Sequence, residues 1–310
     1  MASKARAAGT PGLMKEAMGR EPGMKTGRLK PDPAAASREG PWAGIGPNMR
    51  EDAMDLTHDL TVMAKAQGAS LVGVASVERF KGAPKGHHPT DLLPDAQAVV
   101  SFGIRLLDRV LEWPELLQGS PCVPESMRLD ALHKLFYRRS GYDIINDHLN
   151  TLALLLANHL EDVGYPSLFF PATYGALADN MQQMPGMFSQ RHAAVRAGLG
   201  EFGLNNVVVT ERYGPRIRFN SVLTTAPLTA SSLLSTKTCL GINCNICIDQ
   251  CPAHAFTTLP EASTARIWLD PVSRTDWETC RGKREPLACA GRCLRVCPVG
   301  RSAVSHLPKT

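Results

Sequence analysis

Cysteine is concentrated in one part of the chain, in a pattern that suits metal chemistry. Of the nine cysteines, eight lie between residues 239 and 297. The first four are spaced C-x4-C-x2-C-x3-C-P and the last four C-x8-C-x3-C-x3-C-P; in order they are Cys239, Cys244, Cys247, Cys251, Cys280, Cys289, Cys293 and Cys297. Short gaps followed by Cys-Pro are typical of [4Fe–4S] ligands. The spacing therefore predicts two such clusters, which transfer electrons one at a time.

The ligands of each cluster follow from the pattern of two-cluster ferredoxins, in which the cysteine before proline binds the cluster of the other motif. One cluster then takes Cys239, Cys244 and Cys247 together with Cys297. The other takes Cys280, Cys289 and Cys293 together with Cys251. Both motifs depart from the commonest C-x2-C-x2-C-x3-C-P run, so the partition stays open. The alternative is structural zinc, which usually uses two C-x2–4-C pairs without Cys-Pro endings.

Composition describes a globular protein with a basic tail. Hydrophobic residues make up 44% and charged residues 20% of 310 residues, and the net charge is +5. Residues 1–48 contain eight Lys and Arg against four acids, so this Gly-, Pro- and Ala-rich segment supplies +4. Without a periodic apolar face, we expect residues 1–48 to be disordered. With neither a secretory or twin-arginine leader nor a membrane helix, a cytoplasmic protein with no membrane partner is expected.

The elements that must position these cysteines are mixed. Apolar periodicity predicts a helix from Arg50 that ends at Gly68 and helical structure over 127–163 with a break near Ser140 and Gly141. Strands are expected at residues 71–76, 98–104 and 167–170, and a loop at residues 81–96. A hairpin is predicted from residues 206–211 and 217–225, which flank a Gly-Pro turn. The pattern therefore predicts an α+β core over residues 49–230 and a smaller cysteine-rich domain over residues 231–310.

Four segments carry a resemblance to a known group of enzymes. They are ASLVGVASVERF (69–80), GAPKGHHPTDLLPDAQAVVSFGI (82–104), LANHLEDVGYPS (156–167) and AGLGEFGLNNVVVTERYGPRIRFNSVLTTAPL (197–228). Over roughly residues 50–300 the chain resembles the superfamily of epoxyqueuosine reductase and the corrinoid reductive dehalogenases. The resemblance implies a nitroreductase-like core that holds cobalamin and a ferredoxin-like domain whose two clusters reduce the cobalt. It also implies a low-potential electron donor of the ferredoxin or flavodoxin type, and a substrate that is a small molecule or a tRNA nucleoside.

The same resemblance assigns candidate catalytic residues. Tyr174 with Arg191 would be the proton source of a dehalogenase. Epoxyqueuosine reductase has an acid about 13 residues before AGLG, where this chain has Met184, and the nearest acid is Asp179. His192 could donate a proton or a hydrogen bond, or could be a packing residue.

Candidate cofactor-binding residues follow in the AGLG segment and just after it. Gly198 and Gly200 would let a flat macrocycle approach the backbone, or would only make a tight turn. Asn205 and Asn206 could bind corrin amides or begin a strand.

Two functions compete. The first is a cobalamin-dependent iron–sulfur reductase, which the complete core and its AGLGE segment favour. The second is a non-catalytic electron-transfer or corrinoid-handling protein, which Met184 in place of an acid favours.

Overall fold

The computed structural model describes residues 49–113, 121, 126, 133–173, 186–264, 267–284, 289 and 291–301. The predicted tail and two of the catalytic candidates, Tyr174 and Asp179, lie outside the described residues. Residues 48–310 form one compact unit.

A four-stranded antiparallel sheet is the centre of the fold. Its strand order is β1 (Leu71–Ser76), β2 (Ala98–Arg105), β6 (Ile217–Thr224) and β3 (Ser167–Phe169). The two long strands pair along their whole length, from Ala98 opposite Thr224 to Arg105 opposite Ile217. Nearly all of β2 is buried, as expected of an apolar strand that is covered on both faces. The three strands predicted from apolar runs are thus confirmed.

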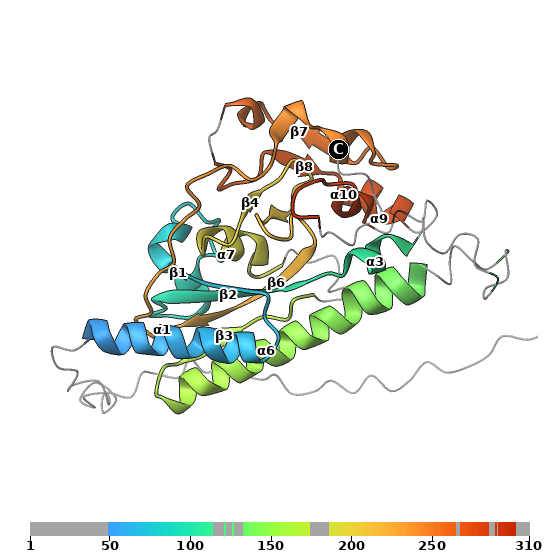
Figure 1. The fold of residues 1–310 in the computed structure, drawn as a ribbon. Coiled ribbons are helices and arrows are strands. Elements are labelled where there is room, and N and C mark those ends of the chain that lie inside the picture. Colours follow the sequence, from blue (N-terminus) through green and yellow to red (C-terminus); the bar gives the residue numbers. More distant parts are fainter. Residues whose placement is uncertain are drawn as a thin grey trace, which may run out of the picture. The chain divides into compact units, whose positions relative to one another are not determined.

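Two long helices cover one face of the sheet (Figure 1). They are α1 (Met49–Ala66) and α6 (Ile144–Asp162), and the π-helix η4 (His133–Asp143) leads into α6. Leu149, Leu152, Leu156 and Leu160 are spaced for one face of α6 and are all buried in the core. Burying each leucine stabilises the fold by about 1.5–3 kcal/mol. The predicted break near Gly141 corresponds to the change from π to α winding.

Helix α7 (Gln190–Arg196) covers the opposite face. Its N-cap is Ser189, whose hydroxyl accepts a hydrogen bond from the His192 N–H, and Ala193 packs with Val99 and Leu223 of the sheet. Three short helices complete this part of the chain: η2 (Val77–Phe80), α2 (Pro89–Leu92) and α3 (Asp108–Leu111). The predicted loop over 81–96 therefore contains one helical turn, α2, with a capping box between His88 and Asp91.

The predicted hairpin of residues 206–211 with 217–225 is wrong. Within this segment β5 (Val208–Val209) pairs with β4 (Glu201–Phe202), while β6 enters the central sheet between β2 and β3. The described residues show a single bridge here, between Thr210 and Gly214 of the turn, which lies outside the expected pairing. The long apolar strand gains more by burial on two faces than by pairing with its neighbour in sequence.

The cysteine-rich segment is made of short elements, which Figure 1 draws in orange and red beyond α7. They are η6 (Gly241–Asn243), α8 (Ile246–Asp249), β7 (Phe256–Thr258), η7 (Pro260–Ser263), β8 (Ser273–Thr275), α9 (Trp277–Arg284) and α10 (Arg292–Arg295). One hydrophobic cluster joins this segment to the rest, because Trp268 packs with Phe202 and Val208. None of the described helices combines the length and apolar character needed to cross a membrane.

Candidate functional site

The two cysteine motifs fold in a similar way. Cys247 lies on α8 and Cys293 on α10, and each helix begins at a left-handed residue: Asn245 (φ 47°) and Gly291 (φ 67°). Each left-handed residue stands two positions before its cysteine. Asparagine and glycine are the residues that adopt this conformation most readily. The shared turn therefore places Cys247 and Cys293 alike, although the gap before Cys293 is one residue longer.

Mutual electrostatic effects relate thiols of the two motifs. Burial, with smaller effects of Cys239, Cys297 and Cys244, raises the pKa of Cys247 to about 12. Burial likewise raises the pKa of Cys297 to about 11, with added effects from Cys239 and Cys244. The first set of interacting thiols therefore contains the first three cysteines and Cys297.

The second set is centred on Cys293. Burial raises the pKa of its thiol well above the ordinary value, and Cys289, Cys247, Cys280 and Cys251 add to the shift in that order. All but Cys247 belong to the second ligand set that the spacing predicts. Cys247 links the two sets.

None of these eight described cysteines forms a disulfide, and the set has the chemistry of iron–sulfur ligands. Burial also raises the pKa of Cys239. Thiols with raised pKa values carry their protons in the metal-free protein, and metal binding releases them. Among the described residues, no three His, Cys, Asp or Glu side chains are grouped so as to hold a single metal ion. Their ligand roles stay a prediction.

A buried acid holds the first cysteine in place. Glu201, which directly follows AGLG, is fully buried. Its Oε1 accepts hydrogen bonds from the N–H groups of Thr238 and Cys239, both at 2.6 Å, and its Oε2 accepts one from the Trp268 N–H at 2.9 Å. Charge-assisted bonds of this kind are the strong ones. The AGLGE segment thus fixes the backbone at Cys239.

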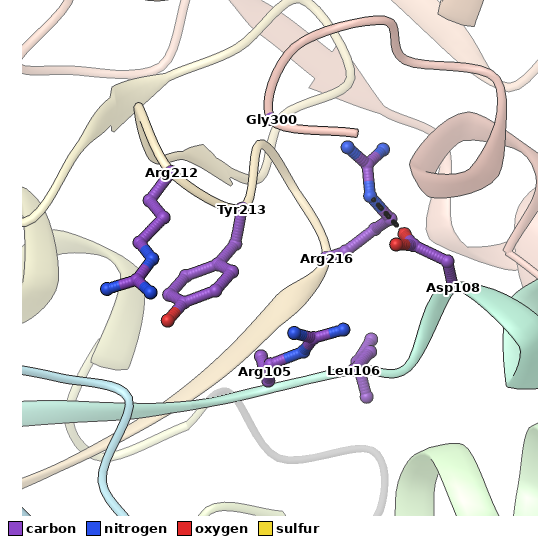
Figure 2. A pocket seen from close by; sticks show the side chains of 7 residues that line it. All are labelled: Arg105, Leu106, Asp108, Arg212, Tyr213, Arg216 and Gly300. Carbon is purple, nitrogen blue, oxygen red and sulfur yellow. Dashed lines mark ion pairs between the residues drawn. The ribbon is translucent and has the colours of Figure 1, made fainter. Parts of the chain in front are cut away.

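A buried arginine holds the last cysteine loop. Arg216 forms an ion pair with Asp108 at 3.0 Å, and both side chains are buried (Figure 2). Its remaining nitrogens donate to the carbonyl groups of Leu294 (3.1 Å), Cys297 (2.9 Å) and Val299 (2.5 Å). The ion pair neutralises the buried charge of Arg216. The bonds to the carbonyl groups connect the loop that carries Cys297 to the start of strand β6.

The two asparagines after AGLG also contact the cysteine-rich segment. The Asn205 amide donates to the Cys293 carbonyl at 3.1 Å, and the Asn206 amide donates to the Thr275 hydroxyl at 3.0 Å. Arg191 donates to the backbone carbonyl and, at 2.9 Å, to the side-chain oxygen of Asn206. Arg191 and Asn206 are therefore in contact, whereas Asn205 contacts the backbone at Cys293.

The two glycines of AGLG make room for the chain's own backbone. A Cβ on Gly198 would lie 2.0 Å from the Ser232 carbonyl oxygen, and one on Gly200 would lie 2.6 Å from the Val209 carbonyl oxygen. Gly198 also has φ +74°, which glycine adopts without strain. The close approach that these glycines permit is to protein, so a bulky residue at Gly200 would clash whether or not a cofactor were bound. Their contact with a macrocycle stays a prediction.

His192 points to a different place from Arg191. It lines a cavity of about 420 Å³ whose other walls include Phe80, Ala83, Pro84, Phe188 and Arg196. The volume is within the roughly 300–1,000 Å³ of small-molecule sites. The His192 ring packs on Phe202 with the centroids 4.9 Å apart, and its Nδ1 lies 2.7 Å from the Ser189 hydroxyl. The cavity is thus apolar with a polar rim.

The charge state of His192 is set by its neighbours. Burial and, to a smaller extent, the cations Arg191 and Arg196 lower its pKa to about 4, against an opposing effect of Asp270. Asp270 Oδ1 lies 4.0 Å from His192 Nε2 and 2.6 Å from the Arg196 guanidinium. At neutral pH the imidazole is therefore uncharged, so it can exchange hydrogen bonds but is not an imidazolium acid. Arg191, whose pKa burial also lowers, lies 5.9 Å from the Phe202 and Trp277 ring centroids.

Sequence reasoning identified the cysteines but missed the residues that support them. Glu201, Asp108 and Arg216 had no place among the candidates. An acid directly after AGLG and an arginine directly after the Gly-Pro turn were visible signals, but neither shows in sequence that it will be buried.

The chain is similar in sequence to two classes of reductase. No family model matches the chain. Epoxyqueuosine reductase of Bacillus subtilis is 23% identical over 225 residues, which is 71% of this chain and 51% of that protein. Tetrachloroethene reductive dehalogenase of Sulfurospirillum multivorans is 29% identical over 113 residues, 34% of this chain and 22% of that protein. The chain therefore spans about half the length of the epoxyqueuosine reductase and a smaller share of the dehalogenase.

Solved structures show the same fold. A catabolic reductive dehalogenase matches with a TM-score of 0.53 at 18% identity, over 81% of this chain and 33% of that one. A second reductive dehalogenase, described with a mechanism for B12-dependent dehalogenation, matches with a TM-score of 0.53 at 17% identity, over 84% of this chain and 34% of that one.

Proposed function

Relatives among both epoxyqueuosine reductases and reductive dehalogenases support that superfamily for this chain, and from this premise we propose a cobalamin-dependent iron–sulfur reductase. The observation that supports the proposal most is that cysteines of the two motifs lie close enough to act on one another: Cys297 acts on Cys247, and Cys251 acts on Cys293. In this proposal residues 49–230 are a nitroreductase-like core and residues 231–310 a ferredoxin-like domain. Its electron donor would be of the ferredoxin or flavodoxin type, and its substrate a small molecule or a tRNA nucleoside.

The protein's own contribution at the clusters is position and exclusion of water. Cys239, Cys244, Cys247 and Cys297 would hold one cluster, and Cys251, Cys280, Cys289 and Cys293 the other. When bound, the clusters supply one-electron transfer. Glu201 and Arg216 fix the backbone at Cys239 and Cys297, so these two thiols keep their place when the charge of the site changes. Cys251 is buried and the other seven cysteines are partly buried, which limits the access of water to a bound cluster.

The cavity beside His192 fits part of an amphipathic ligand such as a corrin. Its apolar walls suit a flat ring, while His192 and Arg196 can hydrogen-bond polar substituents. When bound, the corrin supplies a reducible cobalt ion. His192, neutral at pH 7, would orient the ligand through a hydrogen bond. The proton required by a reduction would then come from another group, for which Tyr174 and Asp179 remain the proposed candidates.

Metal and sulfide analysis tests the iron–sulfur part. Anaerobically prepared protein is expected to contain about eight iron and eight labile sulfide per chain, because two cubanes each need four of each. Its EPR spectrum after reduction should show [4Fe–4S] signals. Stoichiometric zinc without labile sulfide would overturn the proposal.

Cavity filling tests the corrin part. Wild-type protein is expected to change the visible and EPR spectra of added cob(II)alamin. Ala83→Trp should remove this response by filling the cavity, and Lys85→Trp, at an exposed position that does not line the cavity, should keep it. If wild type gives no response, or if both variants behave alike, the corrin assignment fails. The iron content remains a separate test of whether the protein binds the clusters.

A second function has a specific observation in its favour. Met184 replaces the acid of epoxyqueuosine reductase, and the low pKa of His192 removes an imidazolium acid from the cavity. Both fit an electron-transfer or corrinoid-handling protein. Such a protein would keep eight iron atoms and accept electrons, but it would reduce no organic substrate when supplied with cobalamin and a low-potential donor.

A further inference from the structure

A cationic pocket lies at the end of the central sheet, separate from the cavity beside His192. Its volume is about 190 Å³, and it is lined by Arg105, Leu106, Asp108, Arg212, Tyr213, Arg216 and Gly300 (Figure 2). Arg105 ends β2, whereas Arg212 and Tyr213 belong to the turn before β6. Segments more than a hundred residues apart in sequence thus meet around it.

The charges in the pocket do not balance. Arg216 and Asp108 neutralise each other, and the Arg216 nitrogens are engaged by Asp108 and by the carbonyl groups of the Cys297 loop. Arg105 and Arg212 have no acidic partner among the described residues. Both guanidinium groups instead lie against the Tyr213 ring, at 5.8 and 5.3 Å from its centroid. Two positive charges therefore remain at the pocket.

One hydrogen-bond donor at the pocket also lacks a partner. The Arg105 Nε is buried and has no hydrogen-bond partner. A guanidinium group carries five N–H donors in a planar fork that matches the oxygens of phosphate and carboxylate. Stacking on a ring occupies the face of the guanidinium and leaves these donors at its edge. A buried donor without a partner costs free energy, which a bound acceptor would recover.

Charge and shape together select the ligand. A phosphate group carries a charge of about −1.5 to −2 at pH 7 and offers at least three strong acceptor oxygens, which suits two guanidinium groups. A carboxylate offers one charge and two oxygens. The pocket is smaller than the roughly 300 Å³ at which small-molecule sites begin, so it suits a single anionic group.

We propose that Arg105, Arg212 and Tyr213 form a binding site for a phosphate group, present as free phosphate or as the monoester of a small metabolite. The site is separate from the cavity beside His192. It adjoins the Cys297 loop at Gly300 and at Arg216, whose guanidinium donates to the Cys297 carbonyl.

Calorimetric titration of the full-length, anaerobically prepared protein tests the site in phosphate-free buffer of low ionic strength. The probes are inorganic phosphate, adenosine monophosphate and acetate. One equivalent of phosphate or of the nucleotide should bind saturably, and acetate should bind at least about tenfold more weakly because it lacks the second charge. Tighter binding of the nucleotide than of phosphate would identify a monoester as the ligand, and the reverse order would identify free phosphate.

Variants locate the binding. Arg212→Gln changes an exposed side chain and should keep the fold, yet it should weaken binding about tenfold or more. Arg105→Gln should do the same. Arg274→Gln, which removes an exposed arginine of β8, should bind as wild type does. The proposal is overturned if wild type shows no saturable binding, if acetate binds as tightly as phosphate, or if Arg212→Gln and Arg105→Gln bind with unchanged affinity.

Discussion

At the scale of single residues, the supports of the cysteines are more informative than the cysteines themselves. Glu201 and Arg216 are buried charged groups whose hydrogen bonds end on backbone atoms of the cysteine loops. A buried charge is tolerated only when it is paired or fully hydrogen-bonded. Their burial is therefore a sign that the core and the cysteine loops form one fixed arrangement.

Glu201→Gln should destabilise the protein and its first cluster. The amide keeps one acceptor oxygen but turns an NH2 group toward a backbone N–H, which leaves a buried donor unpaired at a cost of about 1–3 kcal/mol. Thermal unfolding and iron content measure the effect. Glu211→Gln, at an exposed position, is the matched control and should change neither. Equal melting temperatures for the two variants would remove the supporting role of Glu201.

His192 should contribute a dependence of stability on pH. Its pKa is about 4 in the folded protein and about 6.5 in the unfolded chain, so the unfolded state binds the proton first as pH falls. The free energy of unfolding should therefore decrease as pH is lowered from about 6.5 to about 4. The charged groups that face His192 are Arg191, Arg196 and Asp270. Melting curves between pH 7.5 and 5 should show a smaller decrease for His192→Gln than for wild type, and parallel curves would contradict the assignment.

At the scale of elements, we propose that the two motifs exchange their last cysteines. Cys297→Ala should therefore damage the cluster of Cys239, Cys244 and Cys247, and Cys251→Ala should damage the cluster centred on Cys293. EPR spectra of the two reduced variants can tell which cluster is lost. If each variant loses only the cluster of its own motif, the ligands do not cross.

Sequence predicted the elements whose signal is local. Strands β1, β2 and β3 follow from apolar runs, and α1 and α6 from their periodicity. The β4–β5 pair was missed because strands of two residues carry no periodic signal. The hairpin was predicted wrongly because β6 pairs with β2, more than a hundred residues earlier, and no turn signal reports such a pairing. For the same reason the sequence did not predict the burial of Glu201 and Arg216, which depends on partners far away in sequence.

At the scale of the whole molecule, packing and hydrogen bonds join residues 49–230 to the cysteine-rich segment, although the sequence predicted them as separate domains. Phe202 and Val208 pack with Trp268 and Val272 in one hydrophobic cluster. Glu201, Asn205 and Arg216 add hydrogen bonds across the same boundary. We therefore expect the core and the cysteine-rich segment to unfold together in a single transition.

Residues 1–48 should be dispensable for this arrangement. They have no periodic apolar face to bury. A chain that starts at residue 49 should keep its iron content and its melting temperature within about 2 °C of the full-length protein, because it loses little buried area. A large decrease in either would show that the tail contacts the folded unit.

The proposed exchange of cysteines between the motifs would also bear on biosynthesis. Cys239, Cys244 and Cys247 leave the ribosome well before Cys297, and Cys251 well before Cys293. Neither set of four is complete until residues 289–297 have been made, by which time Asn205 and Arg216 can already receive that segment. Iron and sulfide would then be inserted after translation of the whole cysteine-rich segment, in one late step that fills both sites.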